Sequence, residues 1–428
     1  MICRALSVAS RVAGALLLML GLGPPGSTVF GCVAERPSGD FLPSTPSTCG
    51  ADTVVTVRKI EQFDLALEAE NVKVAGLNTD QLMLLERLRR VRSLHLDVAA
   101  LDEAVLEKVA ALGTLERLEI WGVAWGTSPI LRALSKSKSL KTLCIRLCTG
   151  WNDAVLAGIC TITSLQEVDL SDIGPVSAKA LAGLEHLPQL QKLVLWGSDI
   201  LADHNCAFIA KLKSLRQLTI WASKPLGGVL VSSVSKLPLI KLALCDMGSA
   251  SLSDWERLSK HETLEDLEVR PKCRESDKAV AALLSMRKLR RLTLWSSWEI
   301  NGDFMLSLGK NDTLQELVLF DRFDKVPESK WNAATNVSLR KLVVWSPNVA
   351  KGIVPGLPGW ANLSILELDD GSELSRDDLS TIFALPAITD LTVRRVSKSA
   401  CSDDDLRSWC EALRKRRGDA LKSLSVTR

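Results

Sequence analysis

Tryptophan is the residue that this sequence places most regularly. Five of its 12 Trp directly follow a Leu-x-aliphatic triplet, as in "LVLWGS" (residues 193–198) and "LTIWAS" (residues 218–223), whereas Tyr is absent. A Trp side chain offers a broad apolar face, one N–H donor and a ring that attracts cations. A set of such side chains is therefore suited to binding a ligand. These five residues are Trp121, Trp196, Trp221, Trp295 and Trp345.

Sequence motifs for catalysis or metal binding are not found. The chain has no HExxH, phosphate-binding loop or GxSxG motif, and it contains only four His. Its net charge of +3 is too small to indicate a nucleic-acid partner. We therefore predict a protein that is not an enzyme, that holds no cofactor or metal, and that does not bind nucleic acid.

The tryptophans belong to a repeat that covers most of the 428 residues. The last aliphatic position of a Leu-x-x-Leu-x-Leu pattern recurs every 24 or 25 residues from Leu96 to Val393, and a further copy ends at Val426. The alternating aliphatic residues predict a short strand. Apolar residues about three, six and ten positions upstream predict one face of a helix. Examples of this spacing are Val105, Val109 and Leu112 before Leu115.

Polar residues that accept hydrogen bonds from a helix N-terminus stand near the start of each predicted helix. Since one strand and one helix cannot bury their apolar faces alone, neighbouring units must stack. Helices are wider than the spacing of strands, so the stack must curve with its sheet inside. The predicted N-caps are Asp102, Asp153, Ser177, Asp203, Ser253, Ser276 and Ser375.

This pattern resembles the leucine-rich repeat superfamily, and more particularly its ribonuclease-inhibitor-like members. The resemblance covers roughly residues 91–426. It implies an α/β solenoid, or horseshoe, with a parallel concave sheet and convex helices. One departure is that the family usually places Asn or Cys three residues after the last Leu, where this chain has Val123, Cys148, Ile173 and Ser198 in successive repeats.

The side chain after each buried aliphatic pair is expected on the concave face, because side chains alternate along a strand. Aromatic and Arg residues, which are enriched at binding hot spots, dominate this position. Flanking positions carry both signs of charge, which favours a protein or peptide partner. The alternatives are aromatic stacking that only stiffens the sheet and carbohydrate binding. The predicted ligand-binding residues are Trp121, Arg146, Trp196, Trp221, Arg270, Trp295, Phe320, Trp345 and Arg394.

The N-terminus resembles a targeting signal, with Arg4 and Arg11 before a short apolar run. The segment "VFGC" suggests cleavage before Cys32 or, as a loose lipobox, a lipid anchor on Cys32. We expect a secreted or cell-surface protein without a transmembrane span. The predicted divisions are a signal peptide (1–31), a Pro/Ser-rich linker (32–53), an N-terminal cap (54–90), repeats (91–400), and a C-terminal capping helix and strand (401–428).

Cysteines and sequons are consistent with export. Cys32 with Cys49, and Cys401 with Cys410, are candidate disulfide pairs near the two termini, whereas the six Cys within repeats are expected to be small buried hydrophobes. Three sequons predict N-glycosylation. For the first two, the alternative is that Asn ends a helix in the left-handed conformation. The sequons begin at Asn311, Asn336 and Asn362.

Overall fold

The computed structural model describes residues 54–427, apart from 127–128, 172–173, 175, 199–200, 223, 246, 271–274, 296–301, 303, 321–329, 331–337 and 346. The chain divides into two units, Met1–Ala51 and Asp52–Arg428, and the second is described below. The predicted signal peptide and linker, with Cys32 and Cys49, lie outside the described residues, as does Asn336.

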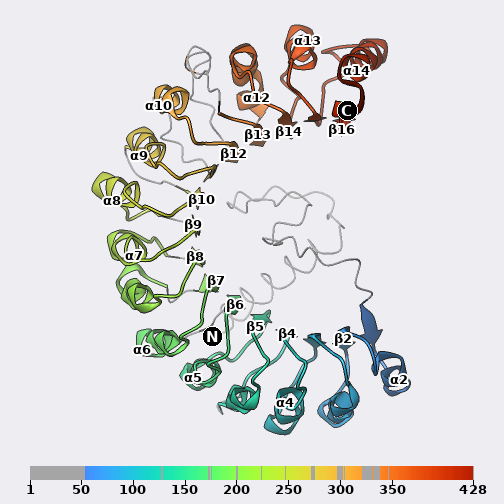
Figure 1. Ribbon diagram of the computed structural model, residues 1–428, viewed down its shortest axis with the longest axis vertical. Coiled ribbons are helices and arrows are strands. Elements are labelled where there is room, and N and C mark those ends of the chain that lie inside the picture. The colour runs from blue at the N-terminus through green and yellow to red at the C-terminus, as the bar shows by residue number, and fades with distance from the viewer. Residues whose placement is uncertain are drawn as a thin grey trace, which may run out of the picture. The chain divides into compact units, whose positions relative to one another are not determined.

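One sheet of 16 parallel strands runs through the second unit, in the order of the sequence. The strands line the inner side of the arc of repeats (Figure 1). They are β1 (Val55–Val57), β2 (Asn71–Ala75), β3 (Ser93–Asp97), β4 (Arg117–Trp121), β5 (Thr142–Arg146), β6 (Glu167–Ser171), β7 (Lys192–Ser198), β8 (Gln217–Ala222), β9 (Lys241–Cys245), β10 (Asp266–Val269), β11 (Arg291–Trp295), β12 (Glu316–Phe320), β13 (Lys341–Trp345), β14 (Ile365–Leu368), β15 (Asp390–Val393) and β16 (Ser423–Val426).

The aliphatic pairs of the repeat set the register of this sheet. Leu193 pairs with Leu218 and Leu195 with Ile220, and all four side chains are fully buried. The same in-register stacking extends from β1 to β16, so that the core is one continuous apolar column between sheet and helices. The predicted parallel solenoid is confirmed. Strands β1 and β2 extend the sheet into residues 54–90.

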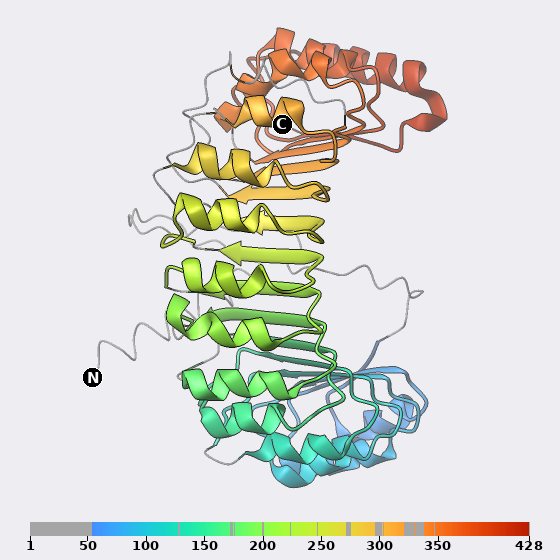
Figure 2. The same ribbon diagram turned by 60° about the vertical axis from the view of Figure 1, so that its left-hand side comes forward.

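Helices lie one above another along the outer side (Figure 2). Some repeats use a 3₁₀ helix, written η, in place of an α-helix. The helices are η1 (Ile60–Gln62), α2 (Phe63–Ala66), α3 (Thr79–Leu82), η2 (Met83–Arg87), α4 (Glu103–Ala110), η3 (Ile130–Lys136), α5 (Asp153–Ile159), α6 (Ala178–Ala182), η4 (Gly183–His186), η5 (Asp203–Lys211), α7 (Gly228–Val234), α8 (Leu252–Leu258), α9 (Ser276–Leu283), α10 (Met305–Lys310), α12 (Pro347–Ile353), η6 (Val354–Gly359), α13 (Arg376–Ala384), α14 (Asp403–Arg417) and η7 (Gly418–Ala420).

The predicted helical faces point into the core. Val105 and Val109 of α4 are fully buried, and Leu112, just after the helix, is almost so. Among the described residues, no helix is both long enough and apolar enough to cross a bilayer.

The five described cysteines of the repeats before β10, Cys144, Cys148, Cys160, Cys206 and Cys245, are partly or wholly buried, and Cys273 lies outside the described residues. Burial raises the pKa of the Cys144, Cys160 and Cys206 thiols to about 12 in each case. Thiols with so high a pKa remain protonated and are poor nucleophiles. At the C-terminal end, Cys410 is a free thiol. The disulfide considered between Cys401 and Cys410 is therefore not formed in this structure.

Three of the predicted N-caps are confirmed: Asp102, Ser177 and Ser375 each accept a hydrogen bond from the backbone three residues on. The other four predictions are wrong. Asn152 caps α5 and Ser251 caps α8, while Ala202 and Glu275 occupy the N-cap positions of η5 and α9 without capping side chains. The sequence assigns these boundaries poorly because several hydrogen-bonding residues are adjacent at each site.

Asp153, Asp203 and Asp277 instead cap the helix of the following repeat. The Asp203 carboxylate accepts hydrogen bonds from the backbone N–H of Gly227, Val229 and Leu230, at 2.9–3.0 Å. Similar bonds join Asp153 to the Ser177 N–H and Asp277 to the Gly302 N–H. Asp203 therefore satisfies helix donors that lack an intrahelical partner, and each of the three carboxylates connects consecutive repeats.

We predict that Asp203→Ala lowers the free energy of unfolding by about 2 kcal/mol, because three N–H groups at the start of α7 lose a charged acceptor. Asp203→Asn keeps one acceptor oxygen and is expected to cost less. Urea unfolding measures both changes. The exposed Glu256→Ala in α8 is the control with the same loss of charge, and equal destabilisation by the two Ala variants would contradict this role of Asp203.

Candidate ligand-binding face

The predicted binding residues lie at the same position of successive strands, on the concave side of the sheet. Trp196 is in register with Trp221, and Trp295 with Phe320 and then Trp345. The Trp side chains are half-buried rather than fully exposed. They are buried by one another, since the Leu-rich core lies on the opposite face of the sheet.

Five of these rings form a continuous row that we call the aromatic strip: Trp196, Trp221, Trp295, Phe320 and Trp345. Successive ring centroids are 4.9, 5.8, 4.4 and 5.3 Å apart. The arrangement alternates between tilted, edge-on and stacked pairs, which are the favourable geometries for aromatic rings. The strip thus extends from β7 to β13.

The contact between Trp221 and Trp295 bridges a gap in the sequence pattern. These residues lie on β8 and β11, and the two intervening strands carry Cys245 and Arg270 at the equivalent position. The indoles nevertheless meet edge to face at 5.8 Å. Arg270, a predicted binding residue, directly follows β10 and is half-buried.

Phe320 differs from the prediction. It is only 6% exposed and forms a small apolar cluster with Val318 and Val343, against which Trp295 and Trp345 pack. The expectation that its ring is exposed on the concave face is therefore wrong, because the larger indoles on both neighbouring strands cover it. Its contribution is to fix the positions of Trp295 and Trp345.

Trp121 belongs to a separate group near the N-terminal end of the sheet. Its ring contacts His95 at 4.9 Å, and the Arg146 guanidinium lies 6.0 Å from its centroid, at the limit of a cation–π contact. Arg146 also pairs with Asp169 at 2.5 Å. At the other end, the exposed Arg394 pairs with Asp369 at 2.6 Å. Arg146 and Arg394 thus both have carboxylate partners within the chain.

Alternating charges form a second row on the concave face, four residues before the aromatic strip along each strand, which we call the charge ladder. It runs through Lys241, Asp266, Arg291, Glu316 and Lys341, one residue on each strand from β9 to β13. Adjacent charged groups are 3.2, 3.0, 2.6 and 3.1 Å apart. The face therefore combines an apolar row with a row of almost balanced charge.

Two carboxylates on this face have opposite pKa shifts. A hydrogen bond with His95 and the nearby Arg117 guanidinium lower the pKa of Glu119 to about 2, despite its partial burial. Burial raises the pKa of Glu268, and the hydrogen bond that it accepts from the Trp295 indole N–H at 2.7 Å only partly offsets this. Glu119 is thus held ionised, whereas ionisation of Glu268 is disfavoured.

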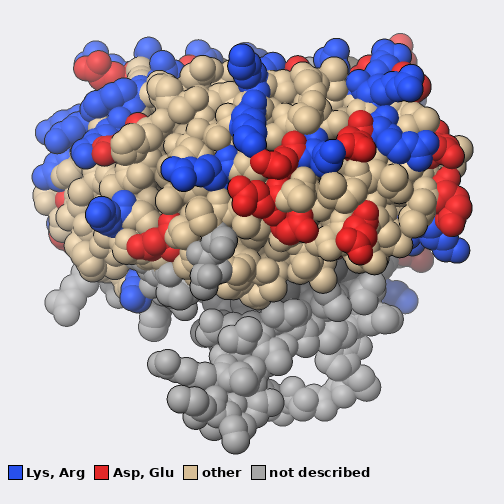
Figure 3. All heavy atoms as spheres, turned by 90° about the horizontal axis from the view of Figure 1, so that it is seen from below, with Lys and Arg blue, Asp and Glu red and all other residues tan. Residues whose placement is uncertain are grey.

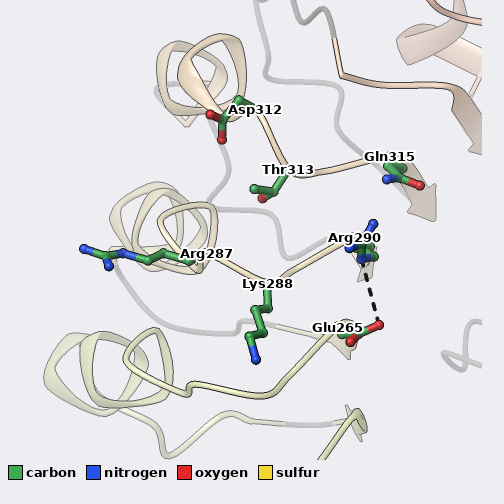
Figure 4. Close-up of a pocket in the computed structure, with 7 residues that line it drawn as sticks. All are labelled: Glu265, Arg287, Lys288, Arg290, Asp312, Thr313 and Gln315. Carbon is green, nitrogen blue, oxygen red and sulfur yellow. Dashed lines mark ion pairs between the residues drawn. The ribbon is translucent and has the colours of Figure 1, made fainter.

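A hollow of about 410 Å³ lies away from the aromatic strip, at the edge where strands begin (Figure 4). Arg290 and Glu265, which line it, form an ion pair at 3.9 Å. On the face shown in Figure 3, Lys and Arg lie among Asp and Glu, and neither sign covers it. Among the described residues, no group of three His, Cys, Asp or Glu side chains is arranged to hold a metal ion.

The two described sequons differ in accessibility. Asn362 is exposed. The Asn311 side-chain amide is hydrogen-bonded within the chain. Its Nδ2 donates to the Leu284 carbonyl at 2.7 Å, and its Oδ1 accepts from the Leu314 N–H at 2.6 Å. Asn311 does end a helix, α10, as the alternative to glycosylation supposed. Its φ of −79° is not left-handed, however, so the predicted left-handed conformation is wrong.

Comparison with known proteins agrees with the repeat. Residues 207–407 match the family model of a leucine-rich repeat region. Two solved structures from Listeria monocytogenes are similar. Internalin C2 has 21% identity and a TM-score of 0.35, and the match covers 49% of this chain and 84% of internalin C2. Internalin InlF has 13% identity and a TM-score of 0.41, and the match covers 86% of this chain and 88% of InlF. No curated protein sequence matches significantly.

The family match and the repeated strand–helix unit define the class of this protein. Residues 207–407 match a leucine-rich repeat region, and the parallel strand–helix solenoid extends the same unit on both sides of that segment. Its assignment to the ribonuclease-inhibitor-like members stays a prediction. Repeats of this kind create extended concave surfaces, so the fold suggests a protein–protein interaction module.

The pH dependence of stability tests the Glu119 network. Its folded-state pKa of about 2 lies below the ordinary 4.5, so ionised Glu119 stabilises the folded chain above about pH 4.5 and loses this effect as the pH falls toward 2. We predict that Glu119→Gln lowers the free energy of unfolding at pH 7 by up to about 3 kcal/mol. This deficit should shrink below pH 4.5.

The melting temperatures of the wild type and of Glu119→Gln, measured between pH 7 and pH 3, show whether the difference in stability becomes smaller. Glu268→Gln is the matched control, because the raised pKa of Glu268 means that its ionisation does not stabilise the folded chain. A Glu119→Gln deficit that stays constant over the whole pH range would contradict the proposed network.

Proposed function

We propose that this leucine-rich repeat protein is exported and binds a protein or peptide ligand on its concave face. The observation that carries the proposal is the aromatic strip, whose five rings contact one another on the inner side of the sheet. Half-buried indoles offer a large contact area at low entropic cost, because their neighbours already restrict their rotation. The proposed anchors are Trp196, Trp221, Trp295 and Trp345.

The charge ladder supports a polypeptide rather than a polyanionic partner. Its cationic members Lys241, Arg291 and Lys341 alternate with Asp266 and Glu316. A phosphate backbone requires a surplus of unpaired cations, which this row does not supply. A peptide with mixed charges can exchange ion pairs with the ladder while its apolar residues contact the strip.

Carbohydrate binding is the second candidate. Indole faces also stack on sugar rings, and the proposed export would expose the strip to glycans. Binding to a glycan array that is lost on replacement of the Trp anchors, without selection of any peptide, would favour this alternative over the first.

Replacement of the Trp anchors tests the proposed function. A peptide selected from a random display library on the wild-type chain serves as probe, and we expect Trp196→Ala, Trp221→Ala and Trp295→Ala together to raise its Kd at least tenfold. Trp360→Phe is the control. This Trp lies at the end of η6, is only 2% exposed, and belongs to the core rather than to the aromatic strip.

Binding and melting temperature are measured on the same samples. If the triple variant melts lower but keeps the wild-type Kd, the aromatic strip only stiffens the sheet and the proposed binding role is wrong. If Trp360→Phe raises the Kd as strongly at an equal loss of stability, the effect of the triple variant is also structural.

Export is tested at the N-terminus. We predict that mass spectrometry of the chain from a secreting cell finds a mature protein that begins at Cys32, because the apolar run and the segment "VFGC" resemble a cleaved targeting signal. An acyl chain on Cys32 would identify a lipid-anchored surface protein, and a glycopeptide containing Asn362 would identify a eukaryotic secretory route. Recovery of only the uncleaved Met1 peptide would contradict export.

A further inference from the structure

The concave face has a middle column of side chains, which lies between the charge ladder and the aromatic strip, two residues after the ladder position on each strand. Four carboxylates belong to this column, and three of them pair with a cation of the chain. Glu268 on β10 is the exception, because it forms no ion pair with any Lys or Arg of the described residues. The three paired carboxylates are Glu119 with Arg117 at 2.8 Å, Asp169 with Arg146 at 2.5 Å, and Glu367 with Lys341 at 3.7 Å.

The charges nearest to Glu268 are already engaged with one another. Lys241 on β9 and Arg291 on β11 each pair with Asp266, at 3.2 and 3.0 Å. Lys241 favours the ionised form of Glu268 whereas Asp266, on the same strand, opposes it, so their effects on the Glu268 pKa partly cancel. Arg270, two residues further along the same face, forms no ion pair with Glu268. The described residues therefore leave this carboxylate without a counter-ion of its own.

The Glu268 carboxylate lies against the indoles of the aromatic strip. One of its oxygens accepts a hydrogen bond from the Trp295 Nε1–H at 2.7 Å, and Trp295 meets Trp221 edge to face at 5.8 Å. Its neighbours in the middle column are the small residues Ala243 and Thr293. Glu268 is half-buried, and burial raises its pKa because the bond from the indole only partly replaces the lost hydration. This place thus combines aromatic surface with a carboxylate whose charge is poorly compensated.

We propose that the ligand of the aromatic strip presents a cationic side chain, Arg or Lys, to Glu268 and lays the aliphatic part of that side chain against Trp221 and Trp295. This inference rests on the proposed function, because it names the chemistry of one residue that the strip receives. The methylene groups of Arg and Lys pack on apolar surface, and their charged ends are attracted both by an indole face and by a carboxylate. The bound cation supplies the missing counter-ion and favours ionisation of Glu268.

Peptide display on the full chain tests this inference. A random peptide library is selected in parallel on the wild type and on Glu268→Gln. We expect the wild type to select Arg or Lys at one position, close to aromatic or aliphatic residues, and Glu268→Gln to lose this preference. Glu367→Gln is the matched control, because it changes a carboxylate of the same column that already has Lys341 as its partner. It should select the same basic position as the wild type.

A double-mutant cycle with one selected peptide measures the contact itself. Glu268→Gln should raise the Kd of this peptide at least tenfold, and so should replacement of the basic residue of the peptide by Gln. Both changes together should be little worse than either one, because they remove the same ion pair. Gln at position 268 keeps an oxygen that accepts the Trp295 N–H, so we expect an unchanged melting temperature. The peptide replacement leaves the protein unaltered and is therefore independent of its folding.

The outcomes separate this inference from the proposed function. Peptides that need the Trp anchors but carry no basic residue would overturn the inference and leave the proposed function standing. The same conclusion follows if Glu268→Gln selects the basic residue as strongly as the wild type, or if the two changes of the cycle simply add, because the cation then lies elsewhere on the face. A library that yields no peptide dependent on the Trp anchors would overturn both.

Discussion

Unequal width of two stacked layers is the constraint on which the rest of this structure depends. Adjacent parallel strands are about 4.8 Å apart, whereas helices with their side chains are about 10 Å wide. The in-register aliphatic pairs, such as Leu193 with Leu218, join the two layers in every repeat. The stack therefore curves toward the sheet, and the sheet becomes the inner wall of the arc (Figure 1).

Curvature brings concave side chains close to those of neighbouring strands. Large rings at this position meet, which is why the indoles are half-buried although they lie outside the main core. Charged residues two columns away find partners by the same geometry. The concave face is consequently preorganised before any ligand arrives, because its side chains already restrict one another.

Stability in such a stack is largely a sum of contacts between neighbours. The carboxylates of Asp153, Asp203 and Asp277 strengthen these contacts, because each stabilises a helix that its own repeat does not contain. Among the described strands, β1 and β16 have one neighbour each. Leu424 of β16 is accordingly half-buried, whereas its partner Leu391 in β15 is fully buried.

The sequence by itself determined the repeat, its parallel strands, its buried helical faces and the side of the sheet on which the tryptophans lie. These features follow from periodicity, which is a local property of the chain. The alternating signs of Lys241, Asp266, Arg291, Glu316 and Lys341 were also visible, and predict a ladder once the strands are known to be in register. Only the tertiary structure decided that Phe320 is covered, that Trp221 meets Trp295 across two intervening strands, and that Asp203 caps the next repeat. Those outcomes depend on ring orientations and on distances between residues 24 or more positions apart, which periodicity does not fix.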